Sequence, residues 1–108
     1  MFGKNNFNWR GGISKDRWGY IRIFIPKHPY SVYKYIFEHR LIIETYIKRY
    51  LLPKEIVHHI NNIKDDNRPE NLMAFTSQSV HKRFEKKLPI NPKNIIFDGR
   101  KFLHNNNS

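Results

Sequence analysis

The chain is organised around the stretch VHHI at residues 57–60, the loop NNIKDDNRPENL at residues 61–72, and a further histidine at position 81. The apolar start of this stretch indicates a strand over Glu55–Ile60, in which neighbouring side chains point to opposite faces. The two adjacent histidines therefore cannot easily do the same job. One can hold a metal ion while the other faces a substrate.

A second strand and a helix are predicted to follow the loop. Leu72–Phe75 has the apolar character of a strand, and Thr76 or Ser77 can cap the next helix by accepting a hydrogen bond from a free backbone N–H. The helix is expected to run to about Lys87, because Pro89 breaks it. The third histidine of the pattern then lies in the first turn of this helix.

Upstream of the histidines, the sequence predicts a β-hairpin. Gly11–Ser14 and Tyr20–Ile25 have the character of strands, with Lys15–Gly19 as the turn between them. The second strand alternates cleanly, which puts its three isoleucines on one face. The prolines that follow end the hairpin, because proline cannot donate to a strand ladder.

Between the hairpin and the histidine pair, the apolar spacing predicts an amphipathic helix from about Val32 to Tyr50. The helix is expected to stop before Pro53. Lys48 and Arg49 are expected in its last turn, where cations suit the negative end of the helix dipole. This helix would supply most of the apolar face on which the histidine-bearing unit packs.

The length of 108 residues predicts a single domain with short tails. The predicted parts are an N-terminal arm and hairpin over residues 1–31, the helix over 32–52, the metal core over 53–88 and a C-terminal tail over 89–108. The first ten residues are expected to be a loosely held arm. The tail contains a candidate strand at Ile95-Ile96-Phe97.

The charge balance points to a polyanionic partner. Twenty Lys and Arg against nine Asp and Glu leave a formal charge of +11, so nucleic acid is the first partner to consider and a membrane surface the second. No apolar run approaches the roughly 20 residues that span a bilayer, and no signal segment is evident, so the chain is expected to be cytoplasmic. The absence of cysteine excludes disulfides and thiolate zinc sites.

The histidine pattern resembles a known family. Two adjacent histidines, an Asn-Leu step after an Asn-Arg-Pro-Glu run, and a later histidine resemble the signature of the HNH endonucleases, most strongly over Glu38–Glu85 and more loosely back to Trp9, where phage-type and homing members are similar. The resemblance implies an α+β protein. Its core would be a small ββα-metal module, with two strands and a helix around one divalent cation, packed on the preceding helix and joined to the N-terminal hairpin.

The resemblance also implies a role for each motif residue. His59 occupies the general-base position, and His58 and His81 occupy the metal-ligand positions. Asn71 occupies the middle position of the motif, where its amide is expected to tie the loop together and support the catalytic strand. Chemically, a neutral imidazole with a pKa of about 6.5 can take a proton from water, and a divalent ion can stabilise negative charge on a phosphate.

The identity of the metal is left open by the ligand set. Many HNH members have an aspartate where His58 stands, and an all-imidazole pair favours zinc, nickel or manganese in bare affinity. Magnesium is nevertheless the ion expected in cells, because it is abundant and the scissile phosphate would supply oxygen. Glu85 lies one turn after His81 and can complete the coordination, although pairing with Lys82 or Arg83 is the favoured interpretation.

Contacts to DNA phosphates are expected from basic residues around the site, namely Arg40, Lys64, Arg68, Lys82 and Arg83. Both tryptophans, at positions 9 and 18, are expected in the core. The histidines at positions 28, 39 and 104 are interpreted as structural, and the two aspartates at 65 and 66 as turn residues.

These observations predict a divalent-metal-dependent DNA endonuclease that leaves 5′-phosphate and 3′-hydroxyl ends. Double-stranded DNA is the expected partner, and the expected state is a monomer or weak homodimer. The Lys, Asn, Ile and Tyr bias suits an AT-rich genome, viral or otherwise. A non-catalytic nucleic-acid-binding module with a structural metal is the alternative from another class. An RNA-directed nuclease of the same fold is a third.

Overall fold

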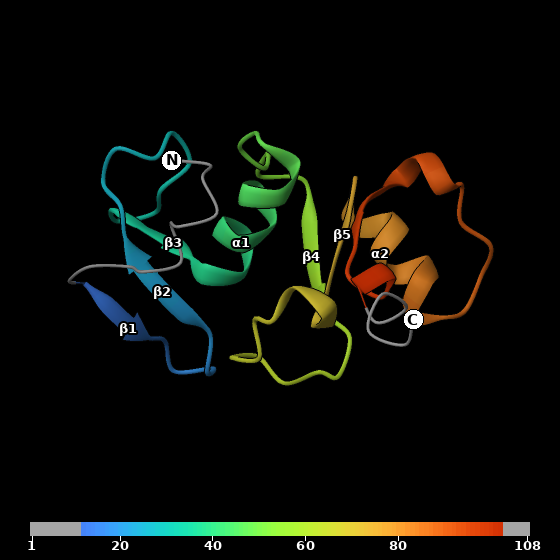
Figure 1. The fold of residues 1–108 in the computed structure, drawn as a ribbon, viewed down its shortest axis with the longest axis horizontal. Coiled ribbons are helices and arrows are strands. Elements are labelled where there is room, and N and C mark those ends of the chain that lie inside the picture. Colours follow the sequence, from blue (N-terminus) through green and yellow to red (C-terminus); the bar gives the residue numbers. More distant parts are fainter. Residues whose placement is uncertain (1–11, 103–108) are drawn as a thin grey trace.

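A computed structural model of the chain describes residues 12–102 (Figure 1). Over this part of the chain the elements are β1 (Ile13–Lys15), β2 (Ile21–Phe24), β3 (Tyr35–Phe37), α1 (Glu38–Ile47), β4 (Ile56–His59), β5 (Leu72–Phe75), α2 (Gln78–Glu85) and β6 (Ile95–Asp98). Short 3-10 turns at Pro69–Asn71 and Pro92–Asn94 precede β5 and β6. The predicted N-terminal arm, Trp9 and His104 lie outside the described residues.

The N-terminal hairpin is present, and it is extended by a third strand. The sheet order is β1-β2-β3, all antiparallel. The prediction of helix from Val32 was wrong, because the chain there forms a second tight turn in which Val32 and Tyr35 exchange backbone hydrogen bonds of 2.9 and 3.0 Å. Tyr33 and Lys34 take positive φ values of 51° and 73° in that turn. Such turns usually contain Gly or Asn, so this sequence gives little sign of one.

Helix α1 is shorter than predicted at both ends. It begins at Glu38 and ends at Ile47, where Lys48 adopts a left-handed conformation with φ 62°. The prediction that Lys48 and Arg49 lie in the last turn was therefore wrong. The chain turns away from the helix axis instead, and Arg49 pairs with Glu55 at 2.9 Å.

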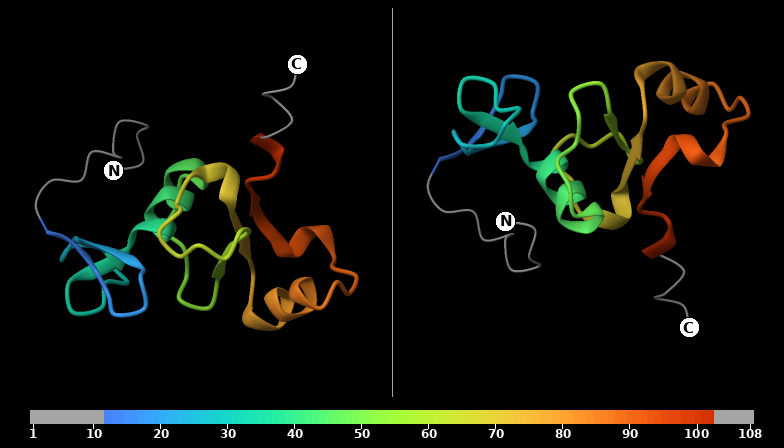
Figure 2. Two further views of the ribbon diagram at one scale, coloured as in Figure 1. Left: turned by 90° about the horizontal axis from the view of Figure 1, so that it is seen from below. Right: turned by 90° about the horizontal axis from the view of Figure 1, so that it is seen from above.

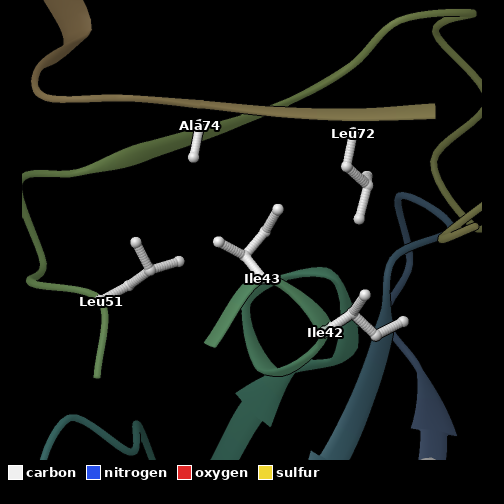
Figure 3. Packing of buried hydrophobic residues seen from close by; sticks show 5 residues of the cluster. All are labelled: Ile42, Ile43, Leu51, Leu72 and Ala74. Carbon is white, nitrogen blue, oxygen red and sulfur yellow. The ribbon is translucent and has the colours of Figure 1, made fainter. Parts of the chain in front are cut away.

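Helix α1 lies between the two sheets and is buried on two sides (Figure 1). On one side Leu41 packs with isoleucines of the N-terminal sheet. On the other side Ile42 and Ile43 pack against Leu72 and Ala74 of β5, and Leu51 closes the same cluster (Figure 3). The helix thus contributes to two separate apolar clusters, one with each sheet.

The second sheet has the order β4-β5-β6, again antiparallel, so the histidine-bearing unit has three strands rather than two. The candidate strand near the C-terminus is confirmed as β6. Each residue of β5 is buried, because β5 is the central strand and both of its faces are covered. A continuous apolar run without alternation is what such a position favours.

Helix α2 covers the face of this sheet opposite α1. Its predicted cap is present, since the Ser77 hydroxyl accepts a hydrogen bond from the backbone N–H of Val80. The helix ends at Glu85, two residues before the predicted end, and Lys87 then takes a φ of 60°. The layers therefore follow one another as sheet, helix, sheet and helix, with the N-terminal sheet and the segment after α2 at opposite ends (Figure 2). No helix among residues 12–102 is long and apolar enough to cross a membrane.

Candidate metal centre and adjoining cleft

Strand β4 sends its two histidines to opposite faces, as the alternation predicted. His58 lies opposite Met73 and faces α2, where its ring contacts Phe84 and His81. His59 lies opposite Leu72 and faces the side of α1, where its ring contacts His39. One face of a single strand thus joins a cluster of potential metal ligands, and the other joins a buried polar network.

Three side chains converge on the α2 face. His58 Nδ1 and His81 Nε2 are 3.0 Å apart, and Glu85 Oε2 is 3.6 Å from the same nitrogen of His81. One ligand atom from each residue lies within 4.8 Å of the other two. Two nitrogen ligands at about 2.1 Å from one ion would themselves be about 3 Å apart when the bonds meet at a right angle. The donor set and its spacing therefore fit a divalent cation.

The surroundings of His58 keep it suited to metal binding. Burial, followed by repulsion from His81, lowers the pKa of the His58 imidazole. A lowered pKa favours the neutral ring, which is the form that binds a metal. On the other ring, His81 Nδ1 is buried and has no hydrogen-bond partner among residues 12–102. The Nε2 atom of His81 is thus the nitrogen that faces the other two ligands.

Glu85 joins this cluster rather than pairing with its basic neighbours. Its carboxylate is half exposed and reaches His81, whereas Arg83 donates two hydrogen bonds to the carbonyl oxygen of Pro89. Within residues 12–102 no ion pair joins Glu85 to Lys82 or Arg83. The favoured interpretation of Glu85 as a surface ion-pair partner was therefore wrong.

A polar cleft of about 670 Å³ opens beside the cluster. Its lining includes two of the three candidate ligands together with Asn62, Lys87 and Arg100. Arg100 donates from Nε and Nη2 to the carboxylate of Asp98, at 2.9 Å each, which fixes the guanidinium and leaves further N–H groups for a ligand. The sequence analysis did not predict that Lys87 and Arg100 lie at the site. Arg100 is far from the histidine motif in the sequence, and only the pairing of β6 with β5 brings it to the cleft.

The other face holds a hydrogen-bonded network that determines how His59 is protonated. Asn67 Nδ2 donates to Glu38 Oε1 at 2.8 Å, because an ionised carboxylate can only accept. The Asn67 amide oxygen therefore faces His59 Nε2, at 2.7 Å, and this nitrogen must carry the hydrogen. Nδ1 of His59 is then the nitrogen with a free lone pair. Neither Glu38 nor Asn67 was predicted to act here.

His59 is mostly enclosed, with 7% of its surface exposed. Tyr20 and His39 lie against its ring, at centroid distances of 6.0 and 4.9 Å. Burial, and then repulsion from His59 and Arg40, lowers the pKa of His39 to about 3. His39 is thus a neutral, buried ring packed beside the candidate base, which agrees with its interpretation as structural.

The low pKa of His39 predicts a pH-dependent stability. In the unfolded chain its pKa is about 6.5, so between that pH and about 3 the unfolded state binds more protons than the folded state. Folding stability is therefore expected to fall as the pH drops through this window, by about 1.6 kcal/mol between pH 6.5 and 5. His39→Phe, which keeps a ring beside Phe37, should remove this part of the dependence. Urea denaturation of both proteins at several pH values measures it, and parallel curves would contradict the explanation.

Asn71 sits where its amide can hold the loop between β4 and β5. Its Oδ1 accepts from the backbone N–H of Asn61 at 3.0 Å, and its Nδ2 donates to the Asn61 side chain and to the carbonyl of Asp66. Its own backbone carbonyl accepts from Ile60 at 2.8 Å. The loop that follows the two histidines is thereby closed on itself, as expected for this position.

The predicted phosphate contacts lie in different places. Arg40 donates to the carbonyl oxygens of Glu55 and Leu52, so its guanidinium supports the loop before β4. Arg68 pairs with Asp66 at 2.8 Å and stays largely exposed. Lys64 lies over the ring of Tyr20. Lys82 is exposed on α2. DNA binding by these residues and by Arg83 stays a prediction.

Three further predictions concern Trp18, His28 and the two aspartates of the loop between β4 and β5. Trp18 was expected in the core, which was wrong: 58% of its surface is exposed, because the turn after β1 projects it outward. His28 is structural as expected, since its Nε2 lies 3.0 Å from the buried carboxylate of Glu44. Asp65 pairs with Lys15, and Asp66 accepts within its own loop, as turn residues do.

Residues 37–82 match the sequence profile of a family described as HNH endonuclease. Over these residues the chain is similar to the HNH endonucleases. The matched segment contains the two adjacent histidines, Asn71 and His81, but it ends before Glu85 and Arg100. The similarity indicates a nuclease, a class of enzyme that acts on nucleic acid, and the cluster of His58, His81 and Glu85 could hold a metal ion. No curated protein and no solved structure matches the chain.

Proposed function

We propose that this protein is a divalent-metal-dependent endonuclease that hydrolyses the phosphodiester bonds of DNA. The observation that carries the proposal is the convergence of His58, His81 and Glu85 beside a cleft that also holds Lys87 and Arg100. A cation site next to fixed positive charges suits a phosphate group, which bears negative charge on several oxygens. The formal charge of +11 favours the same class of substrate.

His58, His81 and Glu85 would hold the cation. When bound, a divalent ion supplies positive charge that stabilises the developing negative charge on the phosphate and on the departing 3′ oxygen. Arg100, held by Asp98, would orient the phosphate in the cleft, because a fixed guanidinium loses little freedom on binding. Lys87 would add a second positive charge on the same side.

His59 would act as general base through Nδ1. Because Asn67 accepts the hydrogen of Nε2, the free lone pair is on the nitrogen that can take a proton from water. The water oxygen then bonds to phosphorus as the bond to the 3′ oxygen breaks, and the departing 3′ oxygen takes a proton from solvent. The products are a 5′-phosphate and a 3′-hydroxyl group. Asn67 and Glu38 take no part in bond making; they set the tautomer and orientation of the ring.

The direct test is a plasmid-nicking assay with the purified full chain. Supercoiled DNA is incubated with magnesium, manganese, nickel or zinc, and with EDTA as the control. We expect conversion to the nicked or linear form with at least one of these ions and none with EDTA. Binding of DNA without cleavage under every ion would contradict the proposal.

The second candidate function is a nucleic-acid-binding module in which the metal only stabilises the fold. The observation in its favour is the enclosure of His59, since 7% exposure leaves a small opening for water. On that alternative, EDTA lowers the melting temperature but DNA is never cut. The nicking assay and a melting curve with and without EDTA separate the two functions.

A further inference from the structure

A groove of about 460 Å³ lies beside the N-terminal sheet and contains none of the three candidate metal ligands in its lining, which also includes Arg40 of α1 and Pro53. Ile23 and Ile36 point to α1, so alternation sends Arg22 and Tyr35 to the opposite face. Arg22 and Tyr35 line the groove together with Trp18 from the turn after β1 and Tyr33 from the segment between β2 and β3. We call it the aromatic groove, defined by Trp18, Arg22, Tyr30, Tyr33 and Tyr35.

Aromatic side chains are unusually exposed along this groove. Trp18 is 58% exposed and Tyr33 92% exposed, whereas a protein that buried its aromatic rings for stability would enclose them. A cluster of exposed rings along a concave surface marks a binding site more often than a packing defect. The lining is mainly apolar, so its ligand must present an apolar face as well as polar groups.

Arginines are stacked on these rings. The guanidinium of Arg17 lies 4.3 Å from the centre of the Trp18 ring, and that of Arg22 lies 4.7 Å from the centre of the Tyr35 ring. Arg22 also donates to the hydroxyl of Ser14, at 3.3 Å from Nε, which holds it against the sheet. The groove thus combines flat apolar surfaces with fixed positive charge.

Charge around the groove favours a polyanion. Over residues 12–37 the basic side chains are Lys15, Arg17, Arg22, Lys27 and Lys34, and the acidic one is Asp16. The carboxylate of Asp16 already accepts hydrogen bonds from the backbone N–H groups of Trp18 and Tyr20, each at 3.0 Å. A negatively charged ligand in the groove therefore meets the single carboxylate of Asp16, against Arg22 and Arg40 of the lining and Arg17 beside Trp18.

From this arrangement we infer that the aromatic groove binds an unpaired segment of nucleic acid. Bases of a single strand can stack on exposed rings while the phosphates pair with the arginines. The bases of a duplex are already stacked on one another, so a duplex would use the charges but not the rings. The inference rests on nucleic acid as the substrate class, and it implies that the preferred DNA has unpaired nucleotides beside the cut.

The test measures binding without cleavage. A fluorescent oligothymidylate and a duplex of equal length are titrated with the full chain in EDTA, and fluorescence anisotropy gives the affinities. Trp18→Ala is expected to weaken single-strand binding about 5- to 100-fold, because stacking on one ring is lost. Duplex binding should change much less. Trp18→Phe keeps a ring and is expected to restore most of the single-strand affinity, and Tyr33→Ala should act in the same direction as Trp18→Ala.

The control is Tyr46→Ala, which removes a ring that is 41% exposed on α1, outside the groove. It should leave single-strand affinity unchanged, and melting curves check that each variant is folded. Unchanged single-strand affinity in Trp18→Ala and Tyr33→Ala, or an equal loss for the duplex, would overturn the inference. So would a dimer that Trp18→Ala converts to monomer, since a second copy of the chain would then occupy the groove.

The outcome is independent of the nuclease proposal. A chain that nicks plasmid normally but shows no effect of Trp18→Ala contradicts the groove alone. A chain that never nicks DNA but shows the expected losses contradicts the proposed catalysis and leaves the groove in place.

Discussion

His81→Ala is expected to abolish metal-dependent cleavage and to weaken binding of the divalent ion itself. His81 contributes Nε2, the atom that lies 3.0 Å from His58 and 3.6 Å from Glu85, so its removal takes the central donor from the cluster. Loss of residues that only orient a ligand costs about 10- to 100-fold in affinity or activity, and loss of a ligand should cost at least as much. Calorimetric titration with manganese and plasmid nicking measure the two effects.

A matched control lies on the same helix. Gln78 is exposed in the first turn of α2 and does not line the cleft, so Gln78→Ala should bind the ion and nick DNA like the unmodified chain. Glu85→Gln, which keeps the size but removes the charge, is expected to weaken ion binding less than His81→Ala. Normal manganese affinity in His81→Ala would show that the cluster is not the metal site.

His59→Ala is the variant expected to separate binding from chemistry. The substitution removes the nitrogen proposed as general base, on the opposite face of β4 from the metal cluster, so the ion and DNA should still bind. A general base contributes about 10²- to 10⁴-fold to a rate, and a loss of this size is expected in single-turnover cleavage. Manganese titration and DNA binding in EDTA should remain close to those of the unmodified chain.

Because His59 is buried, a loss of activity has to be separated from a loss of structure. The melting temperature of His59→Ala and its ion affinity provide this control, since an unfolded chain would lose both. Cleavage at the normal rate in a folded His59→Ala would rule out His59 as the base. That result would not contradict the assignment of the metal site.

Much of the fold followed from local patterns. The hairpin, both strands beside the loop, the capped second helix and the strand near the C-terminus all have sequence signals that physical chemistry explains. The first helix was harder to place, because Val32–Phe37 is as apolar as the helix that follows. The turn at Tyr33 and Lys34 is favoured by sheet pairing and not by its residue types, so no local signal reveals it.

The site was predictable only in part. Adjacency of His58 and His59 on a strand was enough to put them on opposite faces, and the spacing of Glu85 from His81 put both on one side of the helix. Asn67 and Arg100 were not found. Asn67 is oriented by Glu38, which is 29 positions away in the sequence, and such a contact depends on how α1 packs. Arg100 depends in the same way on the pairing of β6 with β5.

The position of β6 has a practical consequence for anyone who shortens this polypeptide. Ending it after Lys82, where the family match stops, would strip one side of the central strand β5. The backbone N–H and C=O groups along that side would then have no partner strand. An unpaired strand edge can form hydrogen bonds with a strand of another molecule. The truncated chain is expected to aggregate at concentrations where the full chain remains in solution.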